Sequence, residues 1–389
     1  MPPPPASIDD LRLRAQKRLP RFLFDFIDGA AGTESTHAAN RSDLDRIGLR
    51  TRVLSGAGTP SLRTKILGRE SAAPFMIAPT GGAGMVRRHG ELHGVRAAHA
   101  AGVPHCLSTM SSVTLEEVAK AGPECDRWFQ LYLTRDRELA RRFVERAKAA
   151  GFRVLMPTVD VPVQGGRRRD MRNGYTVPPR LTWRTVRDIS LRLPWAREIL
   201  LPGAPSFANF DAEGKGFSGA VSIAKAVSAQ LEPCITLADI TWLKDLWQGP
   251  LVVKGVLDPT DAEACVRAGA DGVVVSNHGG RQLDGTQSSI RALAPVVDRI
   301  GHKAEVFLDG GISGGVDVLR ALALGARAVL LGRAWLWGLA AGRQEGVATM
   351  LELVAEEMRI ALRMMGRDRV EIGREAAIIP QDFLTWPNS

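Results

Sequence analysis

A histidine and an arginine stand three residues apart in a glycine-rich segment, Asn277-His278-Gly279-Gly280-Arg281. An imidazole can accept a proton near neutral pH, and a guanidinium can bind a carboxylate through two parallel hydrogen bonds. A lone histidine is more often structural than catalytic, but this short loop supplies a base and an anion clamp together. We therefore predict that His278 is a catalytic base and that Arg281 binds an anionic substrate.

Two further charged groups lie near position 160 of the chain. Asp160 could orient the imidazole and stabilise its protonated form, as the carboxylate of a hydrolase triad does. Arg167, in Gly165-Gly166-Arg167-Arg168-Arg169, is either a second anion ligand or one of three solvated arginines.

Lys254 ends the apolar run Leu251-Val252-Val253. Its amine should emerge at the end of a strand, where a buried cation requires an anionic partner. The N1 and C2-carbonyl edge of a flavin, which becomes negative on reduction, would be such a partner, and a Schiff base is the rival role. Because a separate histidine base is present and no second lysine is close in sequence, the flavin role is favoured.

Glycines follow two of the last apolar runs, in Asp309-Gly310-Gly311 and in Gly332-Arg333. Glycine lets the backbone approach an anion closely, and phosphates often bind to backbone N–H groups at this place in barrels. Arg333 would add a guanidinium. The pair of segments predicts a phosphorylated cofactor.

These residues follow β-branched or aromatic runs that alternate with stretches of helical periodicity, as in parallel βα units. The expected helices include residues 115–119, 139–150, 259–268 and 316–324. Eight units predict a (β/α)₈ TIM barrel of the α/β class, with a doubly wound open sheet as the second choice. The eight expected strands are residues 75–80, 105–109, 128–132, 154–160, 251–254, 273–276, 306–309 and 329–332.

In a barrel, chemistry gathers at the carboxyl ends of the strands. The unusual polar residues of this chain fall there, where a plain core would place apolar residues or turn formers. The whole set favours a functional site: Thr80, Ser108, Gln130, Tyr132, Thr158, Asp160, Lys254, Ser276, His278, Asp309 and Arg333.

The fourth unit is unusually long, with about ninety residues between Asp160 and Leu251. Its stretch from Leu181 to Leu201 interleaves apolar and basic residues, which is typical of a membrane interface, although a lid or a subunit contact would also use such residues. We expect a single domain over 1–389, with an N-terminal segment at 1–71, the barrel at 72–369 and a loop insert at 174–235. The N-terminal segment should hold two helices ending near residues 29–32, then irregular chain that closes the bottom or rim of the barrel.

Composition supports a globular protein. The 389 residues are 45% apolar, no run reaches the roughly 20 apolar residues of a membrane span, and no signal peptide is recognisable. A cytoplasmic location follows by default. The net charge of +9 is spread over the chain without zinc-finger or RNA-binding signatures, so nucleic acid is an unlikely partner. The four cysteines, Cys106, Cys125, Cys234 and Cys265, lack metal or disulfide spacing and are expected to be buried thiols, with no metal site.

Four motifs resemble one family. They are residues 276–284 (SNHGGRQLD), 128–132 (WFQLY), 251–255 (LVVKG) and 321–326 (ALALGA). The chain is similar to FMN-dependent 2-hydroxy acid dehydrogenases and oxidases, above all to bacterial flavin-type L-lactate and mandelate dehydrogenases. The resemblance implies FMN as cofactor and the oxidation of a 2-hydroxy acid to the 2-oxo acid, with electrons passed to a quinone, another carrier or oxygen.

The resemblance also implies a role for each matching residue. His278 would take the substrate's proton beside Asp160, and Arg281, Arg167 and Tyr132 would bind the substrate. Lys254 would stabilise the reduced flavin. The remaining implied cofactor ligands are Pro79, Thr80, Gly81, Ser108, Gln130, Thr158 and Ser276 around the ring system, and Asp309, Gly310, Gly311, Ser313, Gly332 and Arg333 around the ribityl phosphate.

The chain departs from the family pattern at three places. Many members have a tyrosine, which reaches the substrate carboxylate, where this chain has Phe26. An arginine pair of the phosphate loop is replaced by Ser313-Gly314, which should weaken FMN retention. Gly81 stands where oxidases usually carry alanine. Phe26 predicts weaker binding of small acids or a bulkier, more apolar substrate.

Several points about function stay open. A related FMN barrel that acts on an amine or a modified peptide is the alternative enzyme, and a flavin-binding protein without activity is the alternative to an enzyme. The electron acceptor is not indicated. A homo-oligomer, a tetramer by analogy, is expected from relatives alone, and peripheral contact with the inner face of the membrane would come through residues 181–201.

Overall fold

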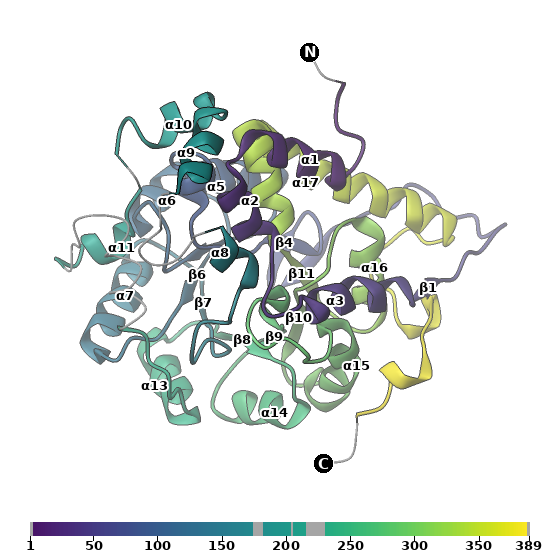
Figure 1. Cartoon of the computed structure of the whole chain (residues 1–389). Helices are drawn as coiled ribbons and strands as arrows, with labels where there is room; N and C mark the ends of the chain where they lie inside the picture. The colour runs from purple at the N-terminus through teal and green to yellow at the C-terminus, as the bar shows by residue number, and fades with distance from the viewer. Residues whose placement is uncertain (1–2, 174–181, 204, 215–229, 387–389) are drawn as a thin grey trace.

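The computed structural model describes residues 3–173, 182–203, 205–214 and 230–386. Figure 1 shows its helices arranged around a central set of strands, which form an eight-stranded sheet. The strands are parallel and pair in the order β7-β6-β5-β4-β11-β10-β9-β8. Their bounds are β4 (Phe75–Ile77), β5 (His105–Ser108), β6 (Arg127–Leu131), β7 (Val154–Pro157), β8 (Val252–Val256), β9 (Gly272–Val275), β10 (Glu305–Leu308) and β11 (Ala328–Leu331).

The two outer strands of this order meet and close the sheet. The N–H of Leu155 donates to the carbonyl of Pro250 (3.1 Å), and the N–H of Val159 donates to the carbonyl of Lys254 (2.9 Å). Parallel bridges join Leu155 with Leu251 and Thr158 with Lys254. The predicted (β/α)₈ barrel is therefore confirmed, and all eight expected strands are present, shorter or shifted by a few residues at their ends.

Amphipathic helices cover the outer face of the strands. Each predicted helical stretch corresponds to one of them, because apolar positions at a spacing of three and four residues form the face that packs on the sheet. The helices around the barrel are α4 (Ala83–Val86), α5 (Gly90–Ala101), α6 (Leu115–Ala121), α7 (Arg137–Ala149), α13 (Leu237–Trp247), α14 (Pro259–Arg267), α15 (Ser289–Ile300), α16 (Gly315–Ala323) and α17 (Arg333–Met364).

The inside of the barrel is filled by side chains that point inward from the strands. Met76, Trp128 and Phe307 are fully buried there, and the rings of Trp128 and Phe307 meet edge to face. Ile66, in the hairpin of β2 (Thr64–Ile66) and β3 (Arg69–Ser71), belongs to the same cluster. This hairpin closes the amino ends of the strands, as predicted for the N-terminal segment.

The N-terminal prediction was incomplete, since the β2–β3 hairpin and a further helix both lie in chain that was expected to be irregular. After α1 (Ile8–Arg18) and α2 (Arg21–Asp28), a third helix, α3 (Ser35–Asp45), occupies chain that was expected to be irregular. The carboxylate of Asp284 accepts hydrogen bonds from the N–H groups of Thr33 (2.6 Å) and Thr36 (3.0 Å) at its start. The capping group therefore comes from a distant part of the chain.

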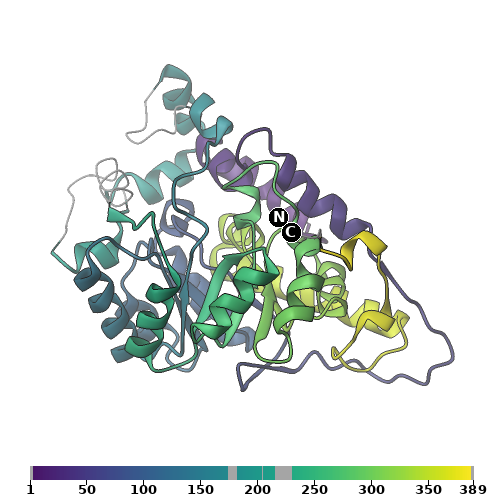
Figure 2. The ribbon, with the colours of Figure 1, turned by 90° about the horizontal axis from the view of Figure 1, so that it is seen from below.

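Part of the long insert packs on the barrel. Its described helices are α8 (Arg168–Arg172), α9 (Trp183–Ser190), α10 (Leu193–Ile199) and α11 (Ala208–Asp211). Trp195 of α10 is buried, and its indole N–H donates to the carbonyl of Met85 (2.8 Å). In Figure 2, the teal helices α9 and α10 extend away from the barrel. Leu181, the first residue of the stretch expected at a membrane interface, lies outside the described residues.

The cysteine prediction was right for three of the four thiols. Cys106, Cys125 and Cys265 are buried in the barrel and its helices, whereas Cys234 is exposed. Cys234 lies in the connection that precedes α13, outside the helices and strands that the structure describes.

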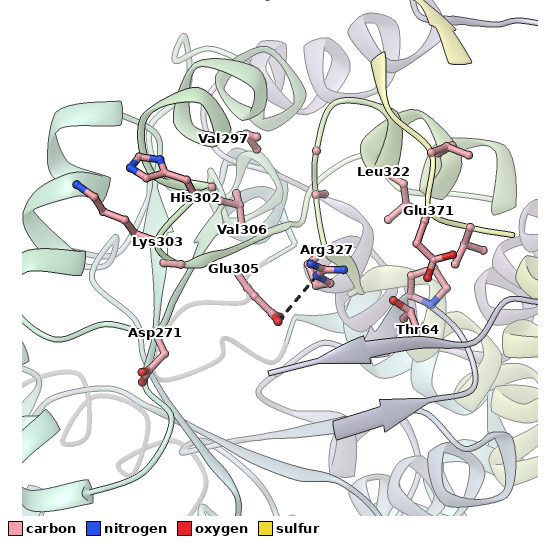
Figure 3. Close-up of a pocket in the computed structure, with 17 residues that line it drawn as sticks. Thr64, Asp271, Val297, His302, Lys303, Glu305, Val306, Leu322, Arg327 and Glu371 are labelled. Atoms are coloured by element: carbon pink, nitrogen blue, oxygen red, sulfur yellow. Dashed lines mark ion pairs between the residues drawn. The ribbon is translucent and has the colours of Figure 1, made fainter. Parts of the chain in front are cut away.

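A cavity of about 600 Å³ opens at the amino ends of β9, β10 and β11. Figure 3 shows its charged lining, which includes Asp271 and the ion pair between Glu305 and Arg327 (3.9 Å). Because parallel strands all point the same way, this cavity lies at the opposite end of the barrel from the polar strand-end residues. It plays no part in the site described below.

Two short antiparallel strands, β1 (Gly48–Leu49) and β12 (Ala377–Ile378), join the N-terminal segment to the end of the described chain. Short 3₁₀ turns lie at η1 (His278–Gly280), η2 (Arg374–Ala376) and η3 (Gln381–Phe383). Of these, η1 carries the predicted base.

Candidate active site

His278 and Asp160 meet at the carboxyl ends of β9 and β7. The imidazole Nδ1 lies 3.1 Å from each oxygen of the Asp160 carboxylate. The two side chains are 22% and 12% exposed. A carboxylate accepts hydrogen bonds, so Nδ1 carries the hydrogen and Nε2 is left to accept a proton.

Asp160 stays ionised beside this imidazole. Burial alone would raise the pKa of its carboxyl group, but the charge and hydrogen bond of His278 and the charge of Lys254 hold the pKa below its ordinary value. An ionised carboxylate stabilises the imidazolium that forms when His278 takes a proton. The pair can therefore act as an oriented general base.

Lys254 is buried beneath this pair. Its Nζ forms an ion pair with Asp309 Oδ2 (2.7 Å) and donates to Ser276 Oγ (2.9 Å). Burial lowers the pKa of the amine, but the charges of Asp309 and Asp160 outweigh this effect and raise it. An anionic partner was predicted for Lys254 from the sequence. Asp309 is one such partner, and the ammonium remains charged.

Ser276 links the lysine to the catalytic loop. Its hydroxyl oxygen accepts hydrogen bonds from Lys254 Nζ and from the N–H of His278 (3.0 Å). The serine is buried at the end of β9. A charge placed near Lys254 would therefore be coupled to the backbone of the base.

Two arginines contact the carboxyl end of α2, where helical carbonyls lack intrahelical partners. Arg281 donates to the carbonyls of Phe26 (2.6 Å) and Gly29 (2.9 Å). Arg333 donates to the carbonyls of Gly29 (3.0 Å) and Gly279 (2.9 Å). These contacts were not predicted from the sequence. They bring both guanidinium groups to the loop of His278.

The positive charges of the site repel one another. Burial, together with the charges of Arg167 and Arg333, lowers the pKa of the Arg281 guanidinium well below its usual range. Burial in the same region lowers the pKa of Arg333 to about 10. The Arg167 side chain is only 16% exposed, which excludes the solvated alternative for it. An anionic ligand would relieve this repulsion.

Phe26 lies between two of these cations. The guanidinium carbons of Arg281 and Arg167 lie 5.0 Å and 5.6 Å from the centre of its ring. Such contacts are worth about 0.5–2 kcal/mol each, depending on burial. The ring therefore holds both arginines in place but offers no hydrogen-bond donor to a ligand.

A chain of polar side chains crosses the mouth of the barrel. Ser108 Oγ donates to Gln130 Oε1 (3.0 Å), and Gln130 Nε2 donates to Thr158 Oγ1 (3.0 Å). All three residues are buried. A core without a binding role would have apolar residues at these strand ends, because burying a polar group costs free energy. The network gives this mouth a fixed pattern of hydrogen-bonding groups.

Two buried oxygens nearby have no hydrogen-bond partner among the described residues: Thr80 Oγ1 and Asp309 Oδ1. Buried polar atoms usually have partners, so these two fit a polar ligand. Tyr132 follows β6 at the same mouth, and burial with the nearby charge of Asp160 raises the pKa of its hydroxyl to about 12. It therefore stays protonated and able to donate a hydrogen bond. Pro79 follows β4 directly before Thr80.

Gly310 and Gly311 follow β10 with φ of 98° and 81°, which favour glycine. A β-carbon on Gly311 would lie 2.4 Å from the carbonyl oxygen of Asn40, so only glycine fits at this position. At Gly332, by contrast, a β-carbon would meet nothing within 4 Å. The open space beside Gly332 leaves room for the predicted phosphate.

Ser313 is engaged within the protein. Its hydroxyl donates to Asp317 Oδ2 (3.1 Å) and accepts from Arg41 Nη1 (2.7 Å), a residue of α3. Its role as a cofactor ligand stays a prediction. Gly81 likewise stays a prediction, and a β-carbon there would lie 3.1 Å from Cβ of Met110.

Sequence reasoning missed several residues of the site. Arg41 and Asn40 come from the unexpected helix α3, and Asn277, quoted as part of the motif, received no role. Asp170 of α8 lies 3.9 Å from Arg167, and its burial raises the pKa of its carboxyl group to about 6. The adjacent histidine, predicted to be the base, was the one available signal for Asn277.

Known proteins resemble the chain over nearly its whole length. A family model described as FMN-dependent dehydrogenase matches residues 15–379. An L-lactate dehydrogenase of Caulobacter vibrioides is 46% identical over 362 residues, which cover 93% of this chain and 94% of that protein. An L-lactate dehydrogenase of Xanthomonas campestris pv. campestris is 43% identical over 387 residues, covering 96% and 99%.

Solved structures with the same fold include an (S)-mandelate dehydrogenase, described as a monotopic membrane protein. It superposes with a TM-score of 0.92 at 36% identity, and the match covers 97% of this chain and 100% of that one. A mandelate oxidase superposes with a TM-score of 0.80 at 40% identity, covering 94% and 96%.

Proposed function

Because the chain belongs to the FMN-dependent dehydrogenase family, we propose that it oxidises a lactate- or mandelate-like 2-hydroxy acid to the 2-oxo acid with His278 as the base. The chain is an FMN-dependent oxidoreductase. The observation that carries the assignment of the base is the contact of His278 Nδ1 with both oxygens of Asp160 at the barrel mouth. With Nδ1 bound to Asp160, Nε2 would be the atom that takes the substrate's proton.

The arginines supply the substrate's binding energy in this proposal. A 2-hydroxy acid is an anion at neutral pH, and Arg281 and Arg167, which share contacts with Phe26, would bind it. The carboxylate would accept hydrogen bonds from them, while the protonated hydroxyl of Tyr132 would donate another. This arrangement would hold the α-carbon between the base and the cofactor.

The reaction removes two electrons and two protons from the α-carbon and its hydroxyl. His278 Nε2 would take one proton, and Asp160 would stabilise the resulting imidazolium. FMN, when bound, supplies the two-electron acceptor. The polar chain at the mouth, the unpartnered oxygens of Thr80 and Asp309, and the cation of Lys254 are the residues that would hold it.

FMN retention is expected to be weak. In this proposal Arg333 and backbone N–H groups hold the phosphate, because Ser313 stands where many members of the family carry an arginine. A charge-assisted hydrogen bond contributes about 1.5–3 kcal/mol, or roughly 10- to 100-fold in the dissociation constant. We expect Ser313→Arg to lower the FMN dissociation constant by this factor, measured by recovery of flavin fluorescence after dilution.

The wild-type protein is the reference in that experiment. Dialysis should remove part of its FMN and leave the Ser313→Arg variant more fully loaded. Complete flavin occupancy of the wild type through dilution and dialysis would show the expectation to be wrong.

Phe26 sets the expected preference among substrates. Phe26→Tyr would add a hydroxyl that can donate to the substrate carboxylate, a bond worth about 1.5–3 kcal/mol. We therefore expect kcat/KM for lactate to rise roughly 10- to 100-fold in steady-state assays. Phe22→Tyr, on the same helix but packed against Trp195, is the matched control and should leave kcat/KM unchanged. An unchanged kcat/KM of Phe26→Tyr for every 2-hydroxy acid tested would contradict this prediction.

We further propose that α9 and α10 contact an anionic membrane surface from the inner side. Trp183, Val186 and Leu193 are exposed there, with basic Arg187 and Arg197 on the same two helices. An interfacial helix buries such apolar side chains among the lipid headgroups. Among the described helices, none has the length and apolar character needed to cross a bilayer.

Vesicle sedimentation tests this surface. Replacing Trp183 and Val186 together by serine should lower binding to vesicles of phosphatidylcholine and phosphatidylglycerol by about tenfold or more, since each apolar side chain contributes about 1.5–3 kcal/mol when buried. The matched control replaces Val53 and Leu54, which are more exposed and lie in another part of the molecule, and should bind as the wild type does. Wild-type protein that remains in the supernatant would contradict the proposal.

The substrate class is tested by anaerobic mixing of the holoenzyme with lactate, mandelate and glycolate. Loss of the flavin's visible absorbance with any of them supports a 2-hydroxy acid. Loss of absorbance with an amine alone would favour the alternative substrate class. The oligomeric state stays a prediction from relatives.

A further inference from the structure

Asn40 of α3 lies at the base of the loop that carries His278, where the N–H of Asn277 also donates to Ser289 Oγ (3.1 Å). Asn40 Nδ2 donates to Asn277 Oδ1 (2.9 Å), and Asn40 Oδ1 accepts from Asn277 Nδ2 (2.8 Å). Asn40 Oδ1 also accepts from the N–H of Ser289 (3.1 Å), where α15 begins. Asn40 and Asn277 are 1% and 5% exposed. The buried amide of Asn40 therefore contacts both ends of the loop, in addition to the direct contacts between Asn277 and residues 287 and 289.

Asn277 transmits this contact to the backbone of the base. Its Oδ1 accepts from the N–H of Gly280 (3.0 Å), which closes a turn around His278 and Gly279. In this turn the φ angles of His278, Gly279 and Gly280 are 56°, 64° and 75°. A left-handed conformation costs a residue with a β-carbon roughly 1–2 kcal/mol. The backbone of His278 must therefore be held in place by its surroundings.

The amide of Asn277 is oriented by its partners on both sides. Its Nδ2 donates to Asn40 Oδ1 and to the carbonyl of Gln287 (3.1 Å), so its oxygen faces Gly280. Without Asn40, each atom of this buried amide would lose one partner. The turn around His278 would then lose part of the hydrogen bonding that holds its conformation.

Other contacts join the same helix and loop without touching Asn277. Asp284 accepts from the hydroxyl of Ser35 (2.8 Å), and Ser288 Oγ donates to Asp43 Oδ2 (2.6 Å). Ser288 is fully buried, as Asn40 nearly is. These contacts allow the docking of α3 to be separated from the support of the turn.

We propose that Asn40 is a positioning residue for the base. Through Asn277 it fixes the backbone of His278, so that Nδ1 meets Asp160 and Nε2 faces the substrate. This inference rests on the proposed role of His278. A displacement of reacting groups by about 1 Å can cost 10²-fold in rate, so a contact outside the substrate site can control the chemical step.

The test is anaerobic stopped-flow reduction of the FMN-loaded enzyme by the best 2-hydroxy acid. Asn40→Ala should lower the limiting rate of flavin reduction by roughly 10- to 100-fold, while the half-saturating substrate concentration changes by less than about threefold. Asn40→Asp keeps the acceptor for Asn277 Nδ2 and Ser289 and should lose less rate. Ser288→Ala, the matched control, should reduce within about twofold of wild type even if its melting temperature falls.

The outcomes separate this inference from the function it rests on. If wild-type flavin is not reduced, the proposed function fails and this inference fails with it. If the wild type is reduced and Asn40→Ala is reduced equally fast, or if Ser288→Ala loses as much rate, only the positioning role is wrong. Should Asn40→Ala not fold, Asn277→Asp applies the same test, since it loses both donated hydrogen bonds while keeping the acceptor for Gly280.

Discussion

His278→Gln is expected to abolish nearly all flavin reduction by the substrate. A general base contributes 10²- to 10⁴-fold, and glutamine keeps a polar side chain of similar size but cannot take the proton, so we expect a fall of about 10³-fold or more. The measurement is the limiting rate of anaerobic flavin reduction in the FMN-loaded variant. The visible spectrum before mixing reports that the flavin is still bound.

A second histidine provides the control for this substitution. His302 lines the cavity at the opposite end of the barrel, so His302→Gln should reduce at the wild-type rate. A His278→Gln variant whose flavin is reduced within tenfold of the wild-type rate would rule out His278 as the base.

Asp160→Asn should have an effect of comparable size through the tautomer of the imidazole. The ionised carboxylate now accepts from Nδ1, whereas an asparagine amide can donate to Nδ1 and move the hydrogen to Nε2. An imidazole with hydrogen on Nε2 cannot take a proton there, and the same exchange in a serine protease triad lowers kcat by about 10⁴-fold. We expect the limiting rate of flavin reduction to fall by on the order of 10³- to 10⁴-fold.

The matched control is Asp271→Asn at the amino end of β9. Asp271 also accepts structural hydrogen bonds, from the N–H of Leu251 (2.8 Å) and from Lys244 (2.7 Å), but it lies far from the imidazole. This variant should keep the wild-type rate. Equal rates for Asp160→Asn and Asp271→Asn would show that the carboxylate beside His278 has no role in orienting it.

The strands and the positions of the strand-end residues could be predicted because local pattern determines them. Apolar runs such as Leu251 to Val253 locate a buried strand, and the barrel requires that the carboxyl ends of all its strands meet at one mouth. This reasoning brought His278 and Asp160 together although they are far apart in sequence. Lys254 was likewise placed correctly as a buried cation beside an anionic group.

The contacts between distant segments could not be predicted in this way. Nothing in the sequence around Ser35 announces α3, because its capping carboxylate is that of Asp284. For the same reason Asn40 had no visible role. Arg281 and Arg333 were predicted as ligands of anions, but their contacts with the carbonyls at the end of α2 depend on how that helix packs over the mouth.

The departures from the family pattern acquired a physical meaning only in the folded chain. Phe26 was recognised as a missing hydroxyl, while its place between two guanidinium groups was not visible in the sequence. Ser313 was recognised as a missing arginine, whereas its contact with Arg41 depends on α3. In both cases the residue type could be interpreted from the sequence, whereas the residues that contact it in the folded chain could not be predicted.

The most direct test of the central claim is the anaerobic titration of the FMN-loaded wild-type enzyme with lactate, mandelate and glycolate. We predict that at least one of these acids removes the visible absorbance of the flavin and that one 2-oxo acid appears per flavin reduced. A flavin that stays oxidised with every 2-hydroxy acid, while the protein is folded and loaded, would contradict the function proposed for this site.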